Sequence, residues 1–476
     1  MRPFPTQSMS IFNISNYFRS SSNHLSNFKQ ILLTNLLPIG IAGIIGVLVF
    51  YKMAIKLKFP FWSKQPIYST ADILFWFVSP KPGIIHDDSR SNSTKYVDYA
   101  HVRSHLFTEL PKENMDVLMD LLQNHFLNDR EAGYFYKPPR SLLEASLPNQ
   151  EAFVSIYRDD NGKAIGCASG RPFFCYHHNT EDVIYNIDHL CVHSGYRKRG
   201  IAPATMQTHE QVQRKQNPHQ SRCSFFKRER KLPLLVPLCR FKTYDFLISN
   251  LVPKDRIQGQ AEQVQAEQPQ GQVEQPQGQA QQVQAQPEAQ KAQKPPNLTL
   301  LPQHYSITKI HKQSLSSYVE FIQNNRHKFD FFATPSFTTQ MDLLNANLTS
   351  IFALIHGGQI RAIFWLRDAF TTTPHGAACE CASLLADAQL PLKDVALGLK
   401  EAIRLFSVER LSTEAQPFHV FYMEGLGHAK AVLDILKNEK PLYQEPMVLS
   451  CEQHYYYLYN YRAAELQPDK CCVLYS

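Results

Sequence analysis

A short basic stretch, Arg197-Lys198-Arg199-Gly200-Ile201-Ala202, holds the residues whose types and spacing are best suited to chemistry. The residues before it, from Tyr185 to Val192, include Ile187 and Leu190 and predict a mostly buried strand, and the residues from Ala202 onward can begin a helix. A strand that ends in a basic glycine turn and opens into a helix directs backbone N–H groups, the positive helix end and cationic side chains to one place. The pattern therefore predicts a pyrophosphate cradle. A solvated basic turn after a buried strand is the alternative.

Two enzyme families resemble this stretch. The spacing Arg197-x-x-Gly200-x-Ala202 resembles the coenzyme A loop of the GNAT acyltransferases. The run Leu190-Cys191-Val192-His193, followed by Arg197 and Ala202-Pro203, resembles the N-myristoyltransferases (glycylpeptide N-tetradecanoyltransferases), which are tandem GNAT folds. Several residues at fixed offsets are less frequent by chance than a single glycine pattern. The resemblance implies an α/β protein with mixed sheets, built of two GNAT-like acyltransferase halves.

Further stretches resemble the same family in the same order along the chain. Phe61-Trp62-x-x-Gln65-Pro66 resembles the N-terminal segment that contacts acyl-CoA, and Phe126 to Asp129 with Tyr134-Phe135-Tyr136 resembles the acidic peptide-binding stretch and its paired aromatics. Tyr456-Tyr457-Leu458-Tyr459-Asn460-Tyr461 lies fifteen residues before Ser476, and both the motif and this distance resemble the family.

The resemblance also implies roles for individual residues. Acyl transfer from a thioester to an amine needs oxyanion donors and a base. The backbone N–H groups of His189 and Leu190 would be the donors, and the α-carboxylate of Ser476 would be the base. Asp129, Tyr134 and Tyr136 would bind the peptide. The implied acyl-CoA contacts are Phe61, Trp62, His189, Leu190, Cys191, Val192, Arg197, Lys198, Arg199, Gly200, Ile201, Ala202 and Pro203. The co-substrate would be acyl-CoA, namely myristoyl-CoA, with no resident cofactor and no metal.

The sequence departs from the family pattern at several positions. Asn186, Asp188, His189 and Ser194 stand where the family has Glu, Asn, Phe and Lys, and Asn128 stands where it has Glu. Counting back from Cys239-Arg240, the run Phe226-Lys227-Arg228-Glu229 replaces Tyr-Thr-Ala-Gly, which removes a threonine that aids proton transfer. No Lys-Phe-Gly-x-Gly-Asp-Gly segment precedes the tyrosine cluster. CoA binding is therefore better predicted than the choice of peptide.

An apolar run near the N-terminus predicts a single transmembrane helix over residues 31–51, which contain no charged residue. A bilayer span needs about 20 such residues. A buried core helix is the alternative, but three glycines and a proline suit a membrane span better. Lysines at 52, 56, 58 and 64 follow the run, and only Arg19 and Lys29 closely precede it, so the positive-inside rule predicts a cytosolic catalytic part.

Composition describes a folded protein of more than one domain. The 476 residues are 43% hydrophobic and 19% charged, which excludes wholesale disorder, and the net charge is +7. Basic residues at 197–199 and 227–231 lack aromatic interleaving, so nucleic acid is not an expected partner. Ten cysteines without a Cys-x-x-Cys pair predict free thiols rather than a zinc site.

The chain divides by composition into five segments. These are a polar tail (1–30), the span (31–51), an N-terminal half that binds acyl-CoA (57–250), a disordered Gln/Pro-rich linker (251–299) and a C-terminal half that binds peptide (300–476). Helices are expected at 115–125, 314–324 and 392–406, and strand pairs at 152–158 with 163–169 and at 350–356 with 359–366.

Three functions are compatible with the sequence. The first is N-myristoyltransferase-like transfer of a long acyl chain to N-terminal glycines, at a membrane reached through one span. The second is a GNAT N-acetyltransferase, because Gly200 matches the general GNAT loop better than the family's Arg does. The third is an inactive, membrane-anchored module that binds acyl-CoA or peptide.

Overall fold

The computed structural model describes residue 34 and residues 37–72, 81–86, 94–147, 151–177, 180–217, 222–267, 301–311, 314–413, 415–442 and 446–474. Residues 1–64 and 65–476 form two separate units.

The N-terminal unit contains one long apolar helix, α2 (Leu37–Lys58), followed by the short helix η2 (Trp62–Lys64). Its segment Pro38–Lys58 is long and apolar enough to cross a membrane, with a mean hydropathy of 1.9 and none of it buried. The helix extends beyond the expected segment 31–51 and takes in Lys52, Lys56 and Lys58. Lysine is a good helix former, so the helix does not end where the apolar run ends.

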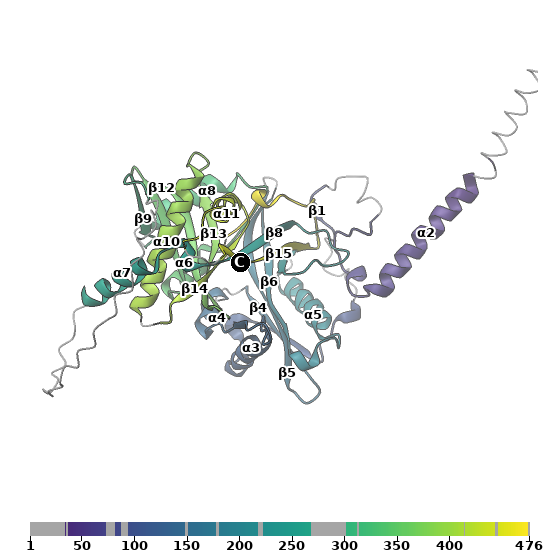
Figure 1. The fold of residues 1–476 in the computed structure, drawn as a ribbon. Helices are drawn as coiled ribbons and strands as arrows, with labels where there is room; N and C mark the ends of the chain where they lie inside the picture. Colours follow the sequence, from purple (N-terminus) through teal and green to yellow (C-terminus); the bar gives the residue numbers. More distant parts are fainter. Residues whose placement is uncertain are drawn as a thin grey trace, which may run out of the picture. The chain divides into compact units, whose positions relative to one another are not determined.

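The C-terminal unit is a mixed α/β structure (Figure 1). Its helices are α3 (Lys112–His125), α4 (Arg140–Ser146), α5 (Ile201–Gln216), α6 (Ile248–Leu251), α7 (Lys254–Glu267), α8 (Leu315–Arg326), α9 (Phe337–Asn345), α10 (Leu392–Ser412) and α11 (His428–Leu436). Its strands are β1 (Gly83–Ile84), β2 (Val102–Leu106), β3 (Phe135–Tyr136), β4 (Phe153–Arg158), β5 (Ala164–His177), β6 (Thr180–Val192), β7 (Ser224–Arg228), β8 (Cys239–Leu247), β9 (Tyr305–Lys309), β10 (Phe331–Pro335), β11 (Thr349–His356), β12 (Gln359–Thr373), β13 (Gly376–Ala386), β14 (Phe418–Glu424), β15 (Val448–Tyr459), β16 (Tyr461–Arg462) and β17 (Cys471–Val473).

One 15-stranded sheet runs through the unit, and twelve of its strands follow the order β17-β10-β5-β6-β7-β15-β8-β14-β13-β12-β11-β9. The other three lie off this path: β4 pairs with β5, β2 with β4, and β3 with β12. The same arrangement occurs in this sheet twice. In the first copy, β4, β5 and β6 are antiparallel neighbours, helix α5 follows β6 in the sequence, and β7 pairs parallel to β6. In the second copy, β11, β12 and β13 are antiparallel neighbours, helix α10 follows β13 in the sequence, and β14 pairs parallel to β13. This repeat is the topology expected of tandem halves.

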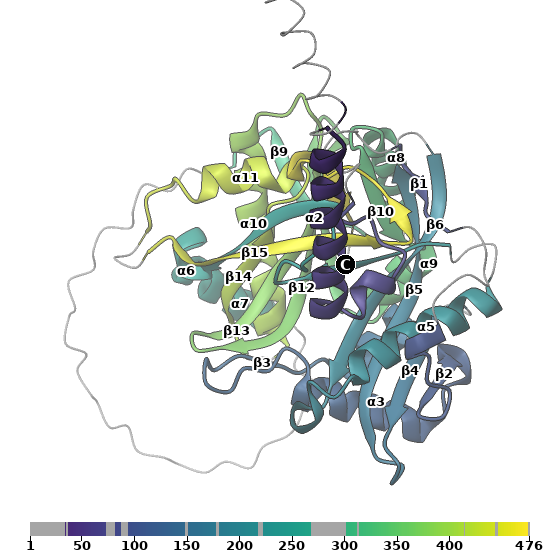
Figure 2. The same ribbon diagram turned by 90° about the vertical axis from the view of Figure 1, so that its right-hand side faces the viewer.

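The two expected halves exchange strands. β15, from the second half, pairs with β7, and β8, from the first, pairs with β14; β8 and β15 also pair with each other. Figure 2 shows β15 running between the strands of the two regions. Strands from the first expected half, from β2 onward, and strands from the second are therefore parts of one sheet.

The expected linker 251–299 begins with ordered structure. Helix α7 (Lys254–Glu267) lies within it, and the side chains of Ile257 and Ala261 are buried in the core that also contains α10. These two apolar residues, four apart, give the helix one face to bury. The rest of the segment, 268–299, lies outside the described residues.

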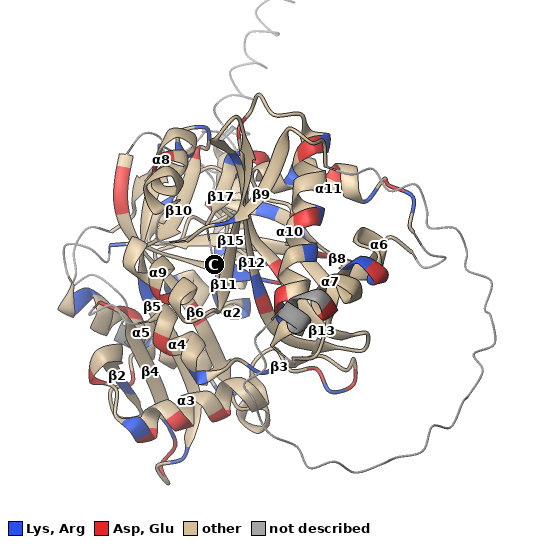
Figure 3. Cartoon of the chain, turned by 90° about the vertical axis from the view of Figure 1, so that its left-hand side faces the viewer, with Lys and Arg blue, Asp and Glu red and all other residues tan. Residues whose placement is uncertain are grey.

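Local patterns predicted the other elements well. The expected helices correspond to α3, α8 and α10, and the expected strand pairs to β4 with β5 and β11 with β12. Gly357 and Gly358, at φ +57° and +76°, form the turn between β11 and β12, which favours glycine at both positions. Basic and acidic residues are interspersed over the elements in Figure 3.

Buried histidines predict that the fold is sensitive to acid. Burial lowers the pKa of His209 and His428 to about 4 and that of His454 to about 3. Because the unfolded chain binds protons at these residues from a pH of about 6.5 downward and the folded chain does not, stability is lost as the pH falls from there toward the folded pKa values. Each histidine costs up to about 2 kcal/mol at a pH of about 5.

Urea denaturation at pH 7.5 and pH 5 measures this loss. His209→Gln, which cannot titrate, should give a smaller loss than the wild type. Equal stability at the two pH values would contradict the prediction.

Candidate functional site

The predicted central strand, β6, contains a bulge at His189. Cys167 pairs with Cys191 and Ser169 with Asp188, so two residues of β6, His189 and Leu190, oppose one residue of β5. His189 has φ +52°, which is uncommon for a residue other than glycine. β6 pairs with β7 only at Tyr185 and Asn186 among the described residues. The bulge lies beyond these two pairs, and bulges are frequent next to binding sites.

The Asp188 carboxylate already accepts a hydrogen bond from one of the N–H groups that were expected to stabilise the oxyanion. The backbone N–H of His189 donates a hydrogen bond to Asp188 Oδ1 at 2.7 Å. Burial alone would raise the pKa of Asp188, but the interaction with the His189 side chain, the charge of Arg171 and this hydrogen bond lower it on balance. An ionised carboxylate at this N–H competes with an oxyanion for the same donor. Leu190, the second expected donor, is half-buried.

The His189 side chain lies inside the fold. Its Nδ1 is 2.8 Å from Ser169 Oγ, and its ring lies 5.9 Å from that of Phe126. Burial lowers the pKa of His189, and the charge of Arg171 adds to this effect, so the imidazole is neutral near pH 7. A neutral ring that is hydrogen-bonded to a serine satisfies the polar atom that an acyl-binding region would otherwise leave unpaired.

The predicted phosphate cradle is a turn followed by the start of α5. Lys198 and Gly200 have φ values of +66° and +82°, and α5 begins at Ile201 with no acidic residue in its first turn. The first N–H groups of a helix have no partner within the helix and attract anions. Lys198 and Arg199 are exposed beside them, and the Arg199 guanidinium lies 5.2 Å from the Tyr196 ring centroid. Five of the expected contacts, at 198–202, therefore lie on one turn.

Arg197 has a structural role in this turn. Its Nη2 donates to the carbonyl of His125, at the end of α3, at 2.9 Å, and its Nε donates to the carbonyl of Val192 at 3.3 Å. These bonds connect the turn to α3 and β6. The His125 ring also lies 3.9 Å from that of His193. The sequence pattern did not identify His125, because its role follows from the position of α3.

Close packing fixes the start of α5. A Cβ on Gly166 of β5 would lie 2.9 Å from Ile201 Cγ2, so only glycine allows this approach. Ile201 and Cys191 are buried, and Cys191 Sγ lies 3.5 Å from the carbonyl oxygen of Leu121. Both side chains therefore support the cradle from inside. Val192 is half-buried, as are Ala202 and Pro203 in the first turn of α5.

Gly200 supplies a direct test of the turn. Gly200→Ala places a side chain at φ +82°, which costs about 1 to 2 kcal/mol in the left-handed region, although the added Cβ would meet no atom. We expect lower stability and weaker acyl-CoA binding, measured by thermal unfolding and calorimetry. Gly195→Ala is the matched control in the same turn, since its Cβ would make only ordinary contacts. Similar losses in both variants would contradict this account.

The expected peptide-binding residues lie on one loop and strand. Asp129 and Tyr134 exchange two backbone hydrogen bonds of 2.9 Å, and Asp129 Oδ1 accepts from the N–H groups of Glu131 and Ala132. Asn128 Oδ1 accepts from the N–H of Tyr136, whose strand β3 pairs with β12. Asp129 and Asn128 thus shape the loop.

Tyr134 faces a group that sequence reasoning missed. Burial and the charges of Asp245 and Glu452 raise the pKa of Tyr134. Burial raises the pKa of Asp245 to about 6, and its Oδ2 accepts from Ser450 Oγ at 2.5 Å. Burial, Asp245 and Tyr134 likewise raise the pKa of Tyr422. These residues come from β8, β14 and β15, so they meet only through the strand exchange.

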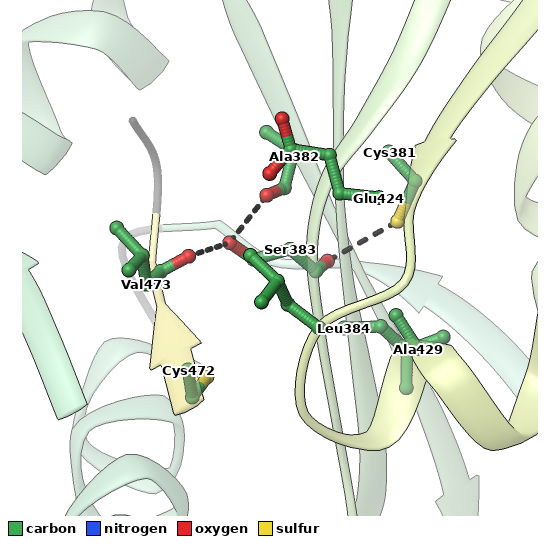
Figure 4. A pocket seen from close by; sticks show the side chains of 9 residues that line it. Cys381, Ala382, Ser383, Leu384, Glu424, Ala429, Cys472 and Val473 are labelled. Atoms are coloured by element: carbon green, nitrogen blue, oxygen red, sulfur yellow. Dashed lines mark hydrogen bonds between the residues drawn. The ribbon is translucent and has the colours of Figure 1, made fainter. Parts of the chain in front are cut away.

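The end of the chain is held as a strand. β17 pairs parallel with β10, the N–H of Leu474 donates to the carbonyl of Ala333 at 2.7 Å, and Ser383 Oγ donates to the carbonyl of Val473 at 2.7 Å. Figure 4 shows the Ser383 hydroxyl between the carbonyls of Ala382 and Val473. Ser476, the expected base, lies outside the described residues.

Phe61 and Trp62, the expected acyl-CoA contacts, lie in the N-terminal unit. Their ring centroids are 5.0 Å apart in an edge-to-face arrangement. Among the described residues, no group of three or more His, Cys, Asp or Glu is arranged to hold a metal ion.

Comparisons with known proteins agree on the fold. Residues 115–222, which include most of α3, the bulge and all of α5, match the model of the acetyltransferase (GNAT) family. A crystal structure of Saccharomyces cerevisiae N-myristoyltransferase with bound myristoyl-CoA matches with a TM-score of 0.58 and 14% identity, covering 86% of this chain and 94% of that one. A second structure of that enzyme, with myristoyl-CoA and inhibitors, matches with a TM-score of 0.57 and 14% identity, covering 89% and 96%. No curated protein sequence matches.

The chain therefore has a divergent N-myristoyltransferase-like GNAT fold. At 14% identity the likeness establishes the fold. The function rests on the site.

Proposed function

We propose that the protein is an acyltransferase that moves a long acyl chain, such as myristoyl, from acyl-CoA to the N-terminal glycine of proteins. The observation that carries the proposal is the cradle at residues 198–202 directly after the bulged strand, within a fold that matches N-myristoyltransferase over 86% of the chain. The GNAT family match over residues 115–222 supports acyl-CoA as the co-substrate.

The reaction would use backbone groups and the chain end. The cradle binds the pyrophosphate, and the N–H groups at the bulge, those of His189 and Leu190, stabilise the oxyanion on the thioester carbonyl. The α-carboxylate of Ser476 takes one proton from the glycine ammonium. The amine attacks the carbonyl carbon, the C–N bond forms, the C–S bond breaks, and CoA leaves as a thiolate that takes the second proton.

Asp188 must release the His189 N–H before that donor can serve. The carboxylate has a second stabilising charge in Arg171, which lowers its pKa. We propose that, when acyl-CoA binds, the backbone N–H of His189 gives up its hydrogen bond to Asp188 and donates one to the thioester carbonyl oxygen. Asp129, Tyr134 and Tyr136 would line the path of the peptide.

A binding module without turnover is the second candidate. The occupied N–H of His189 favours it, because a carboxylate at an oxyanion donor opposes the developing negative charge. An N-acetyltransferase is a third candidate, favoured by the family match.

Membrane attachment is part of the proposal. The apolar helix Pro38–Lys58 would cross the bilayer once, with the lysines at its C-terminal end on the cytosolic side. An anchored enzyme would act where its lipidated products bind.

Transfer is tested with the full chain in detergent, myristoyl-CoA and a peptide that begins with glycine. Mass spectrometry should find the acyl group on the glycine α-amine, together with free CoA. The same peptide with an acetylated N-terminus is the control and should remain unmodified. Acylation of the blocked peptide, or of neither peptide, would overturn the proposed acceptor.

A further inference from the structure

One face of the sheet carries a row of charged side chains across both regions. Paired residues of neighbouring strands point to the same face. On this basis, Glu424 of β14 lies on the same face of the sheet as Thr243 of β8. Tyr422 of β14 lies on the same face as Glu380 of β13, and Glu380 is paired in turn with Arg367 of β12. Residues of one strand two apart also share a face, which joins Glu424 to Tyr422.

Lys227 of β7 reaches this row. Its ammonium forms an ion pair with the carboxylate of Glu424, which lies 197 residues away in the sequence. The side chains are 37% and 14% exposed, so the lysine can swing out while the carboxylate stays in place. Burial works against the charge of Lys227, but Glu424 and Glu380 more than offset it and raise its pKa. Lys227 is therefore an exposed primary ammonium whose ion-pair partner, Glu424, is largely buried.

The other charged groups near this pair have partners of their own. Arg367 forms an ion pair with Glu380. His454 Nδ1 lies 2.5 Å from Thr243 Oγ1, and burial together with the charge of Lys227 lowers its pKa to about 3, so the ring stays neutral. The Lys227 ammonium is thus the ion-pair partner of the Glu424 carboxylate.

Arg367 and a shared pocket connect the pair to the proposed reaction centre. Arg367 acts electrostatically on Lys227 and also on Asp188 and His189 at the bulge. Glu424 lines a small pocket together with Cys472 and Val473, next to the end of β17 (Figure 4). Lys227 also lies two residues after Phe225, which makes the last pair between β7 and β6 among the described residues.

From these contacts we propose that Glu424 forms the binding site for the acceptor's ammonium and that Lys227 occupies this site until the acceptor displaces it. The inference rests on the proposed function in that the acceptor is a primary amine. A lysine ammonium and an N-terminal ammonium are both cations with three donors, so a carboxylate that holds one can hold the other. Lys227 is then a built-in competitor that sets the acceptor concentration needed for binding.

Opposite effects of two substitutions test the proposal. Glu424→Gln removes the binding charge and should weaken binding of a glycine peptide to the acyl-CoA-loaded protein by tenfold or more. Lys227→Met removes the competitor and should tighten it by threefold or more. In the double variant the gain from Lys227→Met should disappear, because the two ammonium groups no longer compete for a charge.

The measurement is calorimetric peptide binding by the full chain in detergent, loaded with a non-hydrolysable myristoyl-CoA analogue, with thermal unfolding as the check on folding. Lys400 and Glu439 form a comparable ion pair between α10 and the segment after α11, with exposures of 18% and 32%. Lys400→Met and Glu439→Gln are therefore the matched controls and should not change peptide affinity.

The outcomes separate this inference from the proposed function. If Lys227→Met weakens peptide binding as much as Glu424→Gln does, or if neither changes it, Lys227 and Glu424 are only a structural pair and the inference is overturned. Peptide binding that follows the expected pattern without any acyl transfer by the wild type would overturn the enzymatic function and leave the ammonium site supported.

Discussion

We expect deletion of Ser476, or addition of two alanines after it, to abolish acyl transfer and to leave acyl-CoA affinity within about twofold of the wild type. The proposed base is the α-carboxylate at the chain end, and β17 is held three residues earlier by the bonds of Val473 and Leu474 to Ser383 and Ala333. A strand fixed at that point places the carboxylate only if the chain length is kept, because each residue moves it by about 3.3 Å. Losing a positioned base lowers the rate by roughly 100-fold to 10,000-fold.

Ser476→Ala is the matched control for this prediction. It keeps the chain length and the carboxylate, so transfer should stay within a few-fold of the wild type. The rate is measured as free CoA released with a glycine peptide as acceptor, and calorimetry measures acyl-CoA affinity. Full transfer by the shortened or extended chain would contradict the role of the carboxylate.

We expect removal of residues 1–56 to release the protein from membranes. The deletion takes away most of the apolar segment Pro38–Lys58, whose large side chains, such as Ile39, Ile44 and Val47, are mostly exposed along the helix. An exposed apolar surface of this kind is stable only in contact with lipid or another apolar partner. The wild type should remain in the pellet after carbonate extraction, and the shortened chain should be in the supernatant.

A chain that lacks only residues 1–30 is the control, because it keeps the whole helix and should stay in the pellet. Protection of the tail from added protease in sealed vesicles tests the orientation. Carbonate-resistant attachment of the chain that lacks residues 1–56 would contradict a membrane span as the anchor.

Short-range patterns predicted the local structure of this chain. The turn Asp159-Asp160-Asn161-Gly162 between two apolar runs predicted the hairpin of β4 and β5, and Gly162 has the positive φ of +78° that such turns favour. The basic turn around Gly200 likewise predicted the start of α5. These features depend on neighbouring residues, whose preferences can be read directly.

Long-range features could not be predicted in this way. The bulge occurs at a histidine, and the residue type does not signal it, since β-bulges depend on how two strands align. The exchange of β8 and β15 brings Tyr134 close to Asp245 and Lys227 to Glu424. The periodicity of a sequence shows which side chains of a strand share a face, but it does not show which strands are neighbours. The pairing of Lys227 with Glu424 therefore could not be predicted, whereas the turn at residues 198–202 could.

Donor choice tests the central claim most directly. The full chain in detergent is incubated with a glycine peptide and either labelled myristoyl-CoA or labelled acetyl-CoA, and the initial rates of peptide acylation are compared. The account predicts transfer of myristate at a rate well above that of acetate. Transfer of acetate alone, or tight binding of myristoyl-CoA with no transfer from either donor, would contradict it.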